Sequence, residues 1–281
     1  MTYTVKQLAE TFLNYVQRED AFQAHLVQMM TISDEHMYID DGMIREGIQF
    51  IERMENGEKE AYYSMAHLLR NLACYDSSFY CLEQAHQLGF VRATYWLGNF
   101  YYEGFGTEEN SAKALECYKL AANAGLADAM NNYADMLLHG EVVEKNEEEA
   151  YVWFNKAAML GVSEAMFTMG YMYEKGVVVE ADESTSIAWF KKAAILGDLY
   201  AANYLGHKAM QHGDFEEAFA FYMQAARGQD VEGEYNVGFC FEEGIGIEQD
   251  TSKAIYWLKR AALQGDELAK QRLALLEDES F

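Results

Sequence analysis

Proline is absent from this chain of 281 residues, and basic residues are scarce, with 21 lysines and arginines against 46 aspartates and glutamates. Without proline an all-β fold would lose its usual turn residue, so the 21 glycines must supply most of the turns, as in helices that end at glycine caps. The net charge of −25 argues against nucleic acid and anionic membranes as partners, because phosphates are bound by clustered lysine and arginine.

Long apolar runs are missing as well. No stretch approaches the roughly 18–20 residues that span a bilayer, and the start of the chain lacks the unbroken apolar segment of a secretory signal. We therefore expect no membrane insertion and, if the N-terminus is native, a cytoplasmic location. The four cysteines form no CxxC pair. We expect buried free thiols at Cys74, Cys81, Cys117 and Cys240, with a Cys74–Cys81 disulfide as the alternative.

The chain repeats itself at a nearly constant step. Pairs of alanines begin at residues 121, 157, 193, 225 and 261, so that the successive steps are 36, 36, 32 and 36 residues. The short step falls where the loop inside one repeat shrinks to Gly213-Asp214. Such a period is the signature of a repeat protein, in which each unit packs against its neighbours.

Each repeat reads as two helices. The first has apolar and small residues at helical spacing and ends at a glycine, namely Gly104, Gly140, Gly176 or Gly244. A polar residue that suits a helix N-terminus follows the loop, namely Asn110, Asn146, Asp182 or Asp250. The second helix carries an aromatic pair or its equivalent four residues before the alanines, at 117–118, 153–154, 189–190 and 257–258. We expect the small alanines to allow close helix packing beside these large side chains.

These residues resemble a known family. The pattern AxxxLGxxYxxGxG…KAxxWxxKAAxxG is most complete at Val237-Gly238, Gly244, Gly246, Lys253-Ala254, Trp257, Lys259, Ala261-Ala262 and Gly265. It resembles the Sel1-like repeat family, a longer-looped relative of tetratricopeptide repeats, over residues 93–265, with departures at Asn155 and at Thr185-Ser186. The resemblance implies an all-α, right-handed superhelical solenoid of Sel1-like or tetratricopeptide-like helix hairpins.

The rest of the chain fits around this block. We interpret residues 44–92 as degenerate repeats, residues 1–43 as an N-terminal helical cap of two amphipathic helices, and residues 266–281 as a C-terminal capping helix. In the last, Lys270, Gln271 and Arg272 are expected to face water. An exposed solenoid end is a sticky apolar surface, which is why caps are expected. Occupation of the groove by residues 1–43 remains an alternative.

Motifs that carry catalysis are lacking. The chain contains no GxSxG, HExxH or Walker sequence, and its seven histidines show no i, i+4 pair. Asp34–Gly42 resembles a calcium loop only in its Asp-Asp-Gly, and we interpret it as a solvated loop. We expect no enzyme activity, no cofactor and no metal. A hydrolase built on His207, Asp135 and Asn99 is a remote alternative, since these residues come from different repeats.

The first helices of tetratricopeptide-like stacks line an inner groove, which points to a binding row. The residues two before and two after the leucine of the first helix, or its equivalent, define it in six units: Tyr63, His67, Tyr95, Asn99, Asn131, Asp135, Phe167, Tyr171, Asn203, His207, Tyr235 and Phe239. Aromatic and amide side chains suit peptide recognition because they offer contact area, few rotors and hydrogen bonds to a backbone. The alternative is that several of the aromatics pack between repeats.

The row contains no lysine or arginine, so a neutral or basic protein segment suits it better than an acidic tail. We therefore interpret the chain as a protein-interaction module, and the resemblance implies an adaptor or scaffold of the kind found in bacteria. An immunity protein that neutralises a basic toxin is the alternative. The acidic run between Glu141 and Glu149 is either a solvated face or a docking patch. The oligomeric state stays open.

Overall fold

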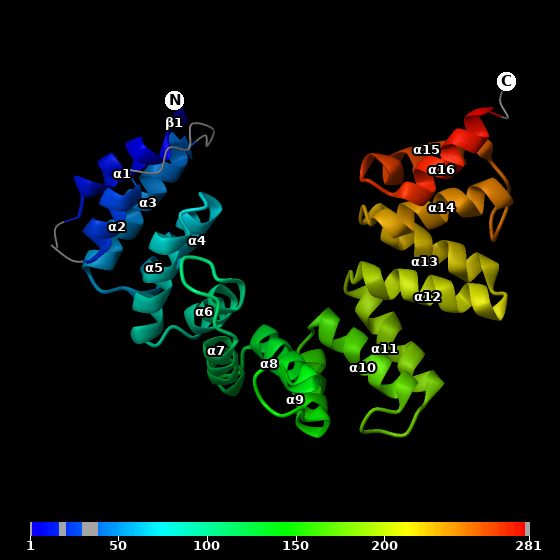
Figure 1. Ribbon diagram of the computed structural model, residues 1–281, viewed down its shortest axis with the longest axis horizontal. Coiled ribbons are helices and arrows are strands. Elements are labelled where there is room, and N and C mark those ends of the chain that lie inside the picture. Colours follow the sequence, from blue (N-terminus) through cyan, green and yellow to red (C-terminus); the bar gives the residue numbers. More distant parts are fainter. Residues whose placement is uncertain (1, 17–20, 30–38, 279–281) are drawn as a thin grey trace. The chain divides into compact units, whose positions relative to one another are not determined.

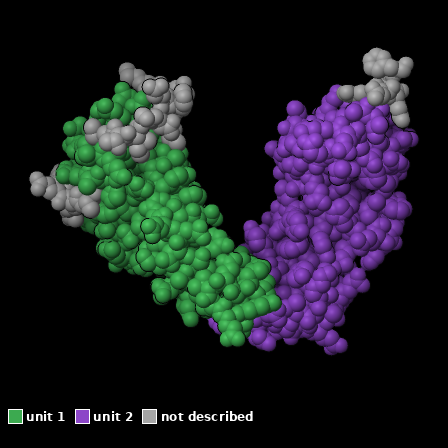
Figure 2. Space-filling view, viewed as in Figure 1, with its two compact units in different colours: residues 1–146 green, residues 147–281 purple. Residues whose placement is uncertain are grey.

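The computed structural model describes residues 2–16, 21–29 and 39–278, and Figure 1 labels its helices. The chain divides into two compact units, residues 1–146 and 147–281 (Figure 2). This division falls between the two helices of one sequence repeat, and the repeat pattern did not predict it. Part of the segment that resembled a calcium loop, residues 34–38, lies outside the described residues.

Unit 1 contains a short antiparallel ladder and eight helices among its described residues. The ladder pairs β1 (Thr2–Tyr3) with β2 (Ile39–Asp40), with Thr2 opposite Asp40. The helices are α1 (Val5–Leu13), α2 (Ala21–Met29), α3 (Asp41–Glu55), α4 (Lys59–Asn71), α5 (Tyr75–Gln87), α6 (Val91–Glu103), α7 (Ser111–Asn123) and α8 (Ala127–His139).

In unit 2 all the secondary structure that the described residues form is helical. Its elements are α9 (Glu147–Met159), α10 (Ser163–Lys175), α11 (Glu183–Ile195), α12 (Leu199–His212), α13 (Phe215–Arg227), α14 (Val231–Glu243), α15 (Thr251–Leu263) and α16 (Glu267–Asp278). Apart from the two-residue ladder of unit 1, the all-α solenoid of helix hairpins predicted from the sequence is confirmed.

Each hairpin begins and ends as the sequence indicated. Helix α6 stops at Gly104, which adopts φ +71° and donates its N–H to the carbonyl of Phe100. Helix α7 is capped by Asn110, whose side chain accepts a hydrogen bond of 3.0 Å from the N–H of Lys113. Asp250 caps α15 in the same way through Lys253. The loops therefore satisfy the backbone groups that helix ends leave open.

A glycine on the first helix of a hairpin receives a large side chain from the second helix. A Cβ at Gly98 would lie 2.5 Å from the ring of Tyr118, so the ring sits directly against the backbone of α6. Gly170 and Phe190 form the same contact, at 2.7 Å. The sequence analysis assigned close packing to the alanine pairs of the second helices, and those alanines are buried. The residue that lies directly against the ring is a glycine of the first helix.

Close packing explains why two of the loops contain a second glycine. A Cβ at Gly106 would lie 2.4 Å from the carbonyl oxygen of Tyr75, and one at Gly246 would lie 2.0 Å from that of Phe215. Tyr75 and Phe215 begin the second helices α5 and α13. In each case the preceding hairpin has a short connection, at residues 72–74 or 213–214. The long loop therefore rests on the start of that helix, which leaves no room for a side chain.

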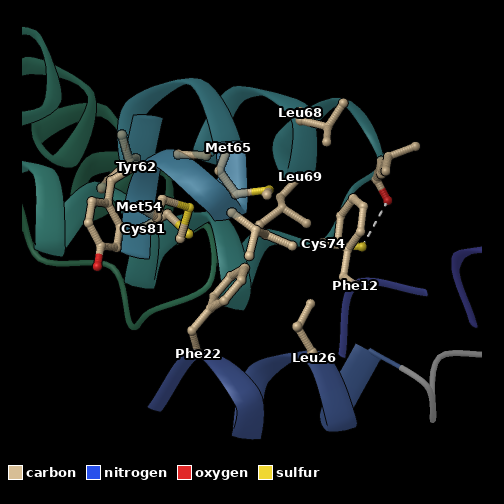
Figure 3. Close-up of a cluster of buried hydrophobic side chains, with 14 of the residues drawn as sticks. Phe12, Phe22, Leu26, Met54, Tyr62, Met65, Leu68, Leu69, Cys74 and Cys81 are labelled. Atoms are coloured by element: carbon tan, nitrogen blue, oxygen red, sulfur yellow. Dashed lines mark hydrogen bonds between the residues drawn. The ribbon is translucent and has the colours of Figure 1, made fainter. Parts of the chain in front are cut away.

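The N-terminal helices share one core with the first complete hairpin. Phe12 of α1 and Phe22 and Leu26 of α2 are buried together with Met65 of α4 and Leu82 of α5. Figure 3 shows Phe22 and Leu26 pointing from α2 toward the side chains of α4 and α5. Burial of such side chains from water is the main stabilising contribution to this end of unit 1.

At the other end of the chain, α16 packs on α15 through Ala269 and Leu273. The prediction that Arg272 faces water is wrong. Its side chain is 27% exposed and pairs with Glu242 at 2.6 Å, and its guanidinium lies 4.3 Å from the ring centroid of Phe239. The sequence pattern of α16 alone did not show this, because both partners belong to α14.

The four cysteines are free and buried, as expected, so the alternative disulfide between Cys74 and Cys81 is excluded. Burial raises the pKa of the Cys117 thiol, and of the Cys240 thiol, to about 11. Both therefore remain protonated and unreactive at neutral pH.

Candidate functional site

The predicted row residues all lie on the first helices of hairpins, and they divide between the units. In unit 1 they are Tyr63 and His67 on α4, Tyr95 and Asn99 on α6, and Asn131 and Asp135 on α8. In unit 2 they are Phe167 and Tyr171 on α10, Asn203 and His207 on α12, and Tyr235 and Phe239 on α14. The two members of each pair are four residues apart and so share a helix face.

The aromatic residues of the row pack mainly within the fold. Phe167 lies 5.0 Å from Phe190 and 4.9 Å from Tyr200, measured between ring centroids. Tyr63 stacks edge-on against Phe90 at 4.9 Å. Phe239 is covered by the Arg272 guanidinium. Several of these rings therefore pack against other side chains of the fold, as the alternative interpretation stated. Tyr171 is an exception, because it is more exposed.

Asn203 departs from the expected exposed row. Its side chain is 2% exposed, and its Nδ2 donates to Oδ1 of Asp230, the residue that caps α14. The same aspartate oxygen accepts the N–H of Gly233. The prediction that Asn203 is exposed is wrong, because its amide connects α12 to the start of the next hairpin.

Two other row residues, Asn99 and Asp135, line one cavity of unit 1. The cavity has a volume of about 270 Å³ and is called here the Asn99 cleft. It is lined by α6, α7 and α8 through Asn99, Tyr102, Glu103, Tyr118, Asn132, Asp135 and Met136. Helices α6 and α8 are the first helices of consecutive repeats, so the cleft is shared by two repeat units.

Hydrogen bonds organise the floor of the Asn99 cleft. The hydroxyl of Tyr118 donates to Oδ1 of Asn99 at 2.8 Å, and Nδ2 of Asn132 approaches the same oxygen at 3.5 Å. Asn131 in turn donates to Oδ1 of Asn132 at 3.4 Å. Burial raises the pKa of Tyr118, which keeps this hydroxyl a donor. The amides of two repeats are thus held in one network.

The rim of the Asn99 cleft is acidic. Tyr102 donates a hydrogen bond of 3.4 Å to Glu141, and the pKa of Tyr102 is raised by that carboxylate and by burial. Burial raises the pKa of Asp135, and nearby Glu141 raises it further, whereas His139 opposes the shift. His139 lies 3.4 Å from the Asp135 carboxylate, and both side chains are more than half exposed. The rim therefore concentrates negative charge.

A second cavity of unit 1 contains Tyr63 and His67. It has a volume of about 310 Å³ and lies between α3 and α4, with Glu46 and Phe50 on the opposite wall. The His67 ring is 4.4 Å from Tyr63 and 4.9 Å from Trp96. Its Nε2 is buried and finds no hydrogen-bond partner among the described residues. Burial and then Arg70 lower the pKa of His67, so the ring is neutral at pH 7.

His207 of unit 2 makes a hydrogen-bonded contact through each of its ring nitrogens. Its Nδ1 pairs with the Tyr222 hydroxyl at 2.9 Å, and its Nε2 with Glu232 at 2.8 Å. This hydroxyl–imidazole–carboxylate order resembles a catalytic arrangement, but Tyr222 is buried and its pKa is raised by that burial. Such a hydroxyl is a poor nucleophile. The contact partners of His207 therefore give the hydrolase alternative no support.

The sequence analysis missed Tyr118 and Tyr222, the second-helix residues whose hydroxyls reach the row. Where that position is tyrosine, the row residue beside it is polar, Asn99 or His207. In the repeat with Phe190 the corresponding row residue is Tyr171, in the repeat with Leu258 it is Phe239, and in the repeat with Phe154 it is the polar Asp135. A tyrosine at this second-helix position was therefore the available signal for a hydroxyl that reaches the row.

Within the part of the chain that the structure describes, no group of three or more His, Cys, Asp or Glu side chains is placed to hold a metal ion. No described helix has both the length and the apolar character needed to cross a bilayer.

The segments of the chain that match a known family coincide with its helix hairpins. The family model for the Sel1 repeat matches residues 91–126, 127–162, 163–198 and 231–266, which together make up half of the chain. The chain belongs to the Sel1 repeat family. The hairpins α4–α5 and α12–α13, with their short connections, lie outside the matched segments although they are built alike.

Solved structures share this architecture. The Sel1 repeat protein from Oxalobacter formigenes is 30% identical, with a TM-score of 0.70 over 75% of this chain and 88% of that one. The protective antigen c5321 of uropathogenic Escherichia coli is 26% identical, with a TM-score of 0.72 over 83% of this Sel1 repeat chain and 52% of that chain. The immunity protein Pa5087 from Pseudomonas aeruginosa shares the fold at 17% identity, with a TM-score of 0.52 over 73% and 81% of the two chains.

Among curated proteins the likeness is confined to short segments. DAP3-binding cell death enhancer 1 of Rattus norvegicus is 40% identical over 55 residues, which are 20% of this chain and 11% of that protein. The Sel1 repeat chain thus spans about a tenth or less of the length of the curated relatives it matches. Sel1 repeats form protein-interaction scaffolds and are generally non-catalytic.

Proposed function

We propose that this chain is a non-enzymatic adaptor or scaffold that binds a peptide segment or a basic partner protein along the inner rows of its first helices. The Asn99 cleft carries the proposal. There, Asn99 and Asp135 of consecutive repeats open into one cavity. Concave cavities with a few converging polar groups are the usual form of a binding site.

The charge of the chain supports a basic partner. A net charge of −25 creates a long-range field that speeds encounter with a cationic protein and disfavours acidic ones. Within the cleft, Glu103 and Asp135 add local negative charge. Complementary charge determines orientation and rate of association, while the amides and aromatic rings contribute short-range contacts.

The experiment compares the capture of binding proteins by three forms of the full chain. The row variant is Asn99→Ala/Asp135→Asn/Tyr171→Ala. The control variant changes exposed residues of second helices, Glu116→Gln/Leu120→Ala/Ile195→Ala. Calorimetry with the purified partner then measures affinity.

A partner that binds the wild type and the control alike, and the row variant at least tenfold more weakly, supports the proposal. Equal affinity for all three forms overturns it. Binding by a purely electrostatic surface would be released equally from all forms by salt, because exposed charges are screened within about 8–10 Å.

An immunity function is the second candidate. Its support is the strongly acidic composition together with the fold shared with the immunity protein Pa5087. In this function the chain would neutralise a basic toxin. Co-expression with toxins encoded beside its gene tests the idea, and survival that depends on the chain favours it over a general scaffold.

A further inference from the structure

Besides being acidic, the Asn99 cleft has more hydrogen-bond acceptors than donors left for a ligand. The Tyr118 hydroxyl donates to Asn99, and the Tyr102 hydroxyl donates to Glu141. The Asn132 amide donates toward Asn99 and the Asn131 amide toward Asn132. Both tyrosine hydroxyls of the cleft are therefore already engaged with acceptors of the protein, and the Asn132 amide donates within it as well.

The acceptors are in surplus. Glu103 and Asp135 each present a carboxylate, which accepts through two oxygens. The side-chain carbonyl of Asn132 accepts from Asn131 and keeps one lone pair, whereas that of Asn99 already accepts from Tyr118 and Asn132. Asp135 has one partner, His139, in an exposed contact of 3.4 Å that contributes little and that a ligand can replace. A ligand that fits this cleft must bring donors and positive charge.

Two helix ends add to the negative potential. Glu103 is the last residue of α6, and Asp135 lies in the second-last turn of α8, which ends at His139. The C-terminal end of a helix carries a partial negative charge because its last carbonyls have no partner within the helix. Both helices therefore favour a cation near the rim.

The size of the cleft and the aromatic ring at its rim restrict the class of ligand further. A volume of about 270 Å³ is slightly smaller than ordinary ligand pockets, which start at about 300 Å³, so it suits one side chain of a partner rather than a large cofactor. Tyr102, with 38% of its surface exposed, offers an aromatic ring at the rim. A guanidinium is planar, stacks on aromatic rings, and carries five donors and no acceptor. An ammonium has three donors and no planar face.

We propose that the Asn99 cleft is a pocket for a single arginine side chain of a partner protein. Glu103 and Asp135 pair with the guanidinium, the carbonyl oxygen of Asn132 accepts one of its remaining N–H groups, and Tyr102 covers its face. This inference rests on the proposed interaction function and specifies the chemistry of the partner at that site.

The test uses the full chain and a pair of probe peptides. The probes are acetyl-Gly-Arg-Gly-amide and the same peptide with citrulline, the neutral isostere of arginine. Titration is followed by NMR through the side-chain amide signals of Asn99 and Asn132, assigned with Asn99→Ala and Asn132→Ala. We expect saturable shifts with the arginine peptide, and at least tenfold weaker binding of the citrulline peptide.

Matched variants locate the contact. Glu103→Gln/Asp135→Asn should weaken the arginine peptide at least fivefold, whereas Glu116→Gln, an exposed change on α7, should leave its affinity unchanged. Thermal unfolding of each variant establishes that it is folded. Arginine binding that leaves the Asn99 and Asn132 signals unmoved overturns the proposal, as does equal binding of citrulline. A third peptide, with lysine in place of arginine, distinguishes the two basic side chains. If it binds as tightly as the arginine peptide, the assignment of arginine is overturned.

The outcome is separable from that of the proposed function. If the arginine peptide fails while the row variant still loses a partner protein, the arginine pocket is wrong and the interaction function stands. If the peptide binds in the cleft but no partner depends on the rows, the pocket stands and the scaffold function is wrong.

Discussion

The Tyr118 hydroxyl reaches Oδ1 of Asn99 at 2.8 Å across the gap that Gly98 leaves open. A residue of the second helix thereby holds a residue of the inner row in place. The contact requires three positions at once: a glycine without a Cβ, a tyrosine rather than phenylalanine, and a polar residue next to the glycine.

Removal of the Tyr118 hydroxyl should measurably lower the free energy of unfolding. Tyr118→Phe removes a buried hydrogen bond and leaves the ring packed against Gly98, so we expect the free energy of unfolding to fall by about 1 kcal/mol. Tyr171→Phe changes an exposed tyrosine and should have little effect. Urea unfolding of the three proteins checks this, and a Tyr118→Phe protein as stable as the wild type would contradict it.

The loop glycines provide a second prediction. Gly106→Ala and Gly246→Ala each place a Cβ against a backbone carbonyl, at 2.4 and 2.0 Å, in a residue of positive φ. We expect a loss of about 2–5 kcal/mol, the sum of the backbone strain of a left-handed residue and of overpacking.

Gly125→Ala and Gly265→Ala are the matched controls for these loop glycines. Their φ values are also positive, but nothing lies within 4 Å of the added Cβ. They should cost only the backbone strain, about 1–2 kcal/mol. Equal losses in both pairs would show that the contacts with Tyr75 and Phe215 do not matter.

Glu174 should stabilise unit 2 except in acid. Burial alone would raise its pKa, but hydrogen bonds from Lys208, Tyr204 and Lys175 outweigh burial and hold the pKa at about 2, below the ordinary 4.5. The unfolded state therefore binds the proton first, and this stabilisation is present above pH 4.5 and is lost as the pH falls toward 2.

Glu174→Gln tests the contribution directly. At pH 7 we expect the variant to be less stable by about 1.5–3 kcal/mol, the range for hydrogen bonds to a charged group. The difference from the wild type should shrink below pH 4.5. Glu180→Gln, an exposed change in the neighbouring loop, is the control. A difference that is independent of pH would contradict the assignment.

His67 should make unit 1 less stable in mildly acidic solution. Its pKa in the folded protein is lowered from 6.5 by burial and by Arg70, so the unfolded chain binds a proton more readily. Stability from this group is full above pH 6.5 and falls as the pH drops below it. Burial also lowers the pKa of His25, which acts in the same direction.

His67→Phe keeps an aromatic ring between Tyr63 and Trp96 and removes the buried nitrogen that has no partner among the described residues. Denaturation between pH 7.5 and 5.0 should show a smaller loss of stability for the variant than for the wild type. Between pH 7.5 and 8.5 the two proteins should change in parallel. Identical slopes across pH 6.5 would refute this role of His67.

Much of the architecture follows from local sequence rules. The step between alanine pairs, the glycine at Gly104 and the acceptor at Asn110 depend on residues close in the chain, because helix spacing and capping are local. The same rules explain why the hairpins and the family resemblance were predicted correctly.

The sequence by itself therefore determined the repeat, the hairpins and the acidic character, since composition and period are sums over neighbouring residues. Tertiary structure alone decided which row residues open into a cavity. Asn203 is buried because Asp230 begins the next hairpin beside it, and Phe239 is covered because Arg272 arrives from α16. Asn99 stays accessible in the cleft that α6, α7 and α8 enclose. Exposure depends on side chains contributed by other elements, and a helix-face pattern contains no information about those neighbours.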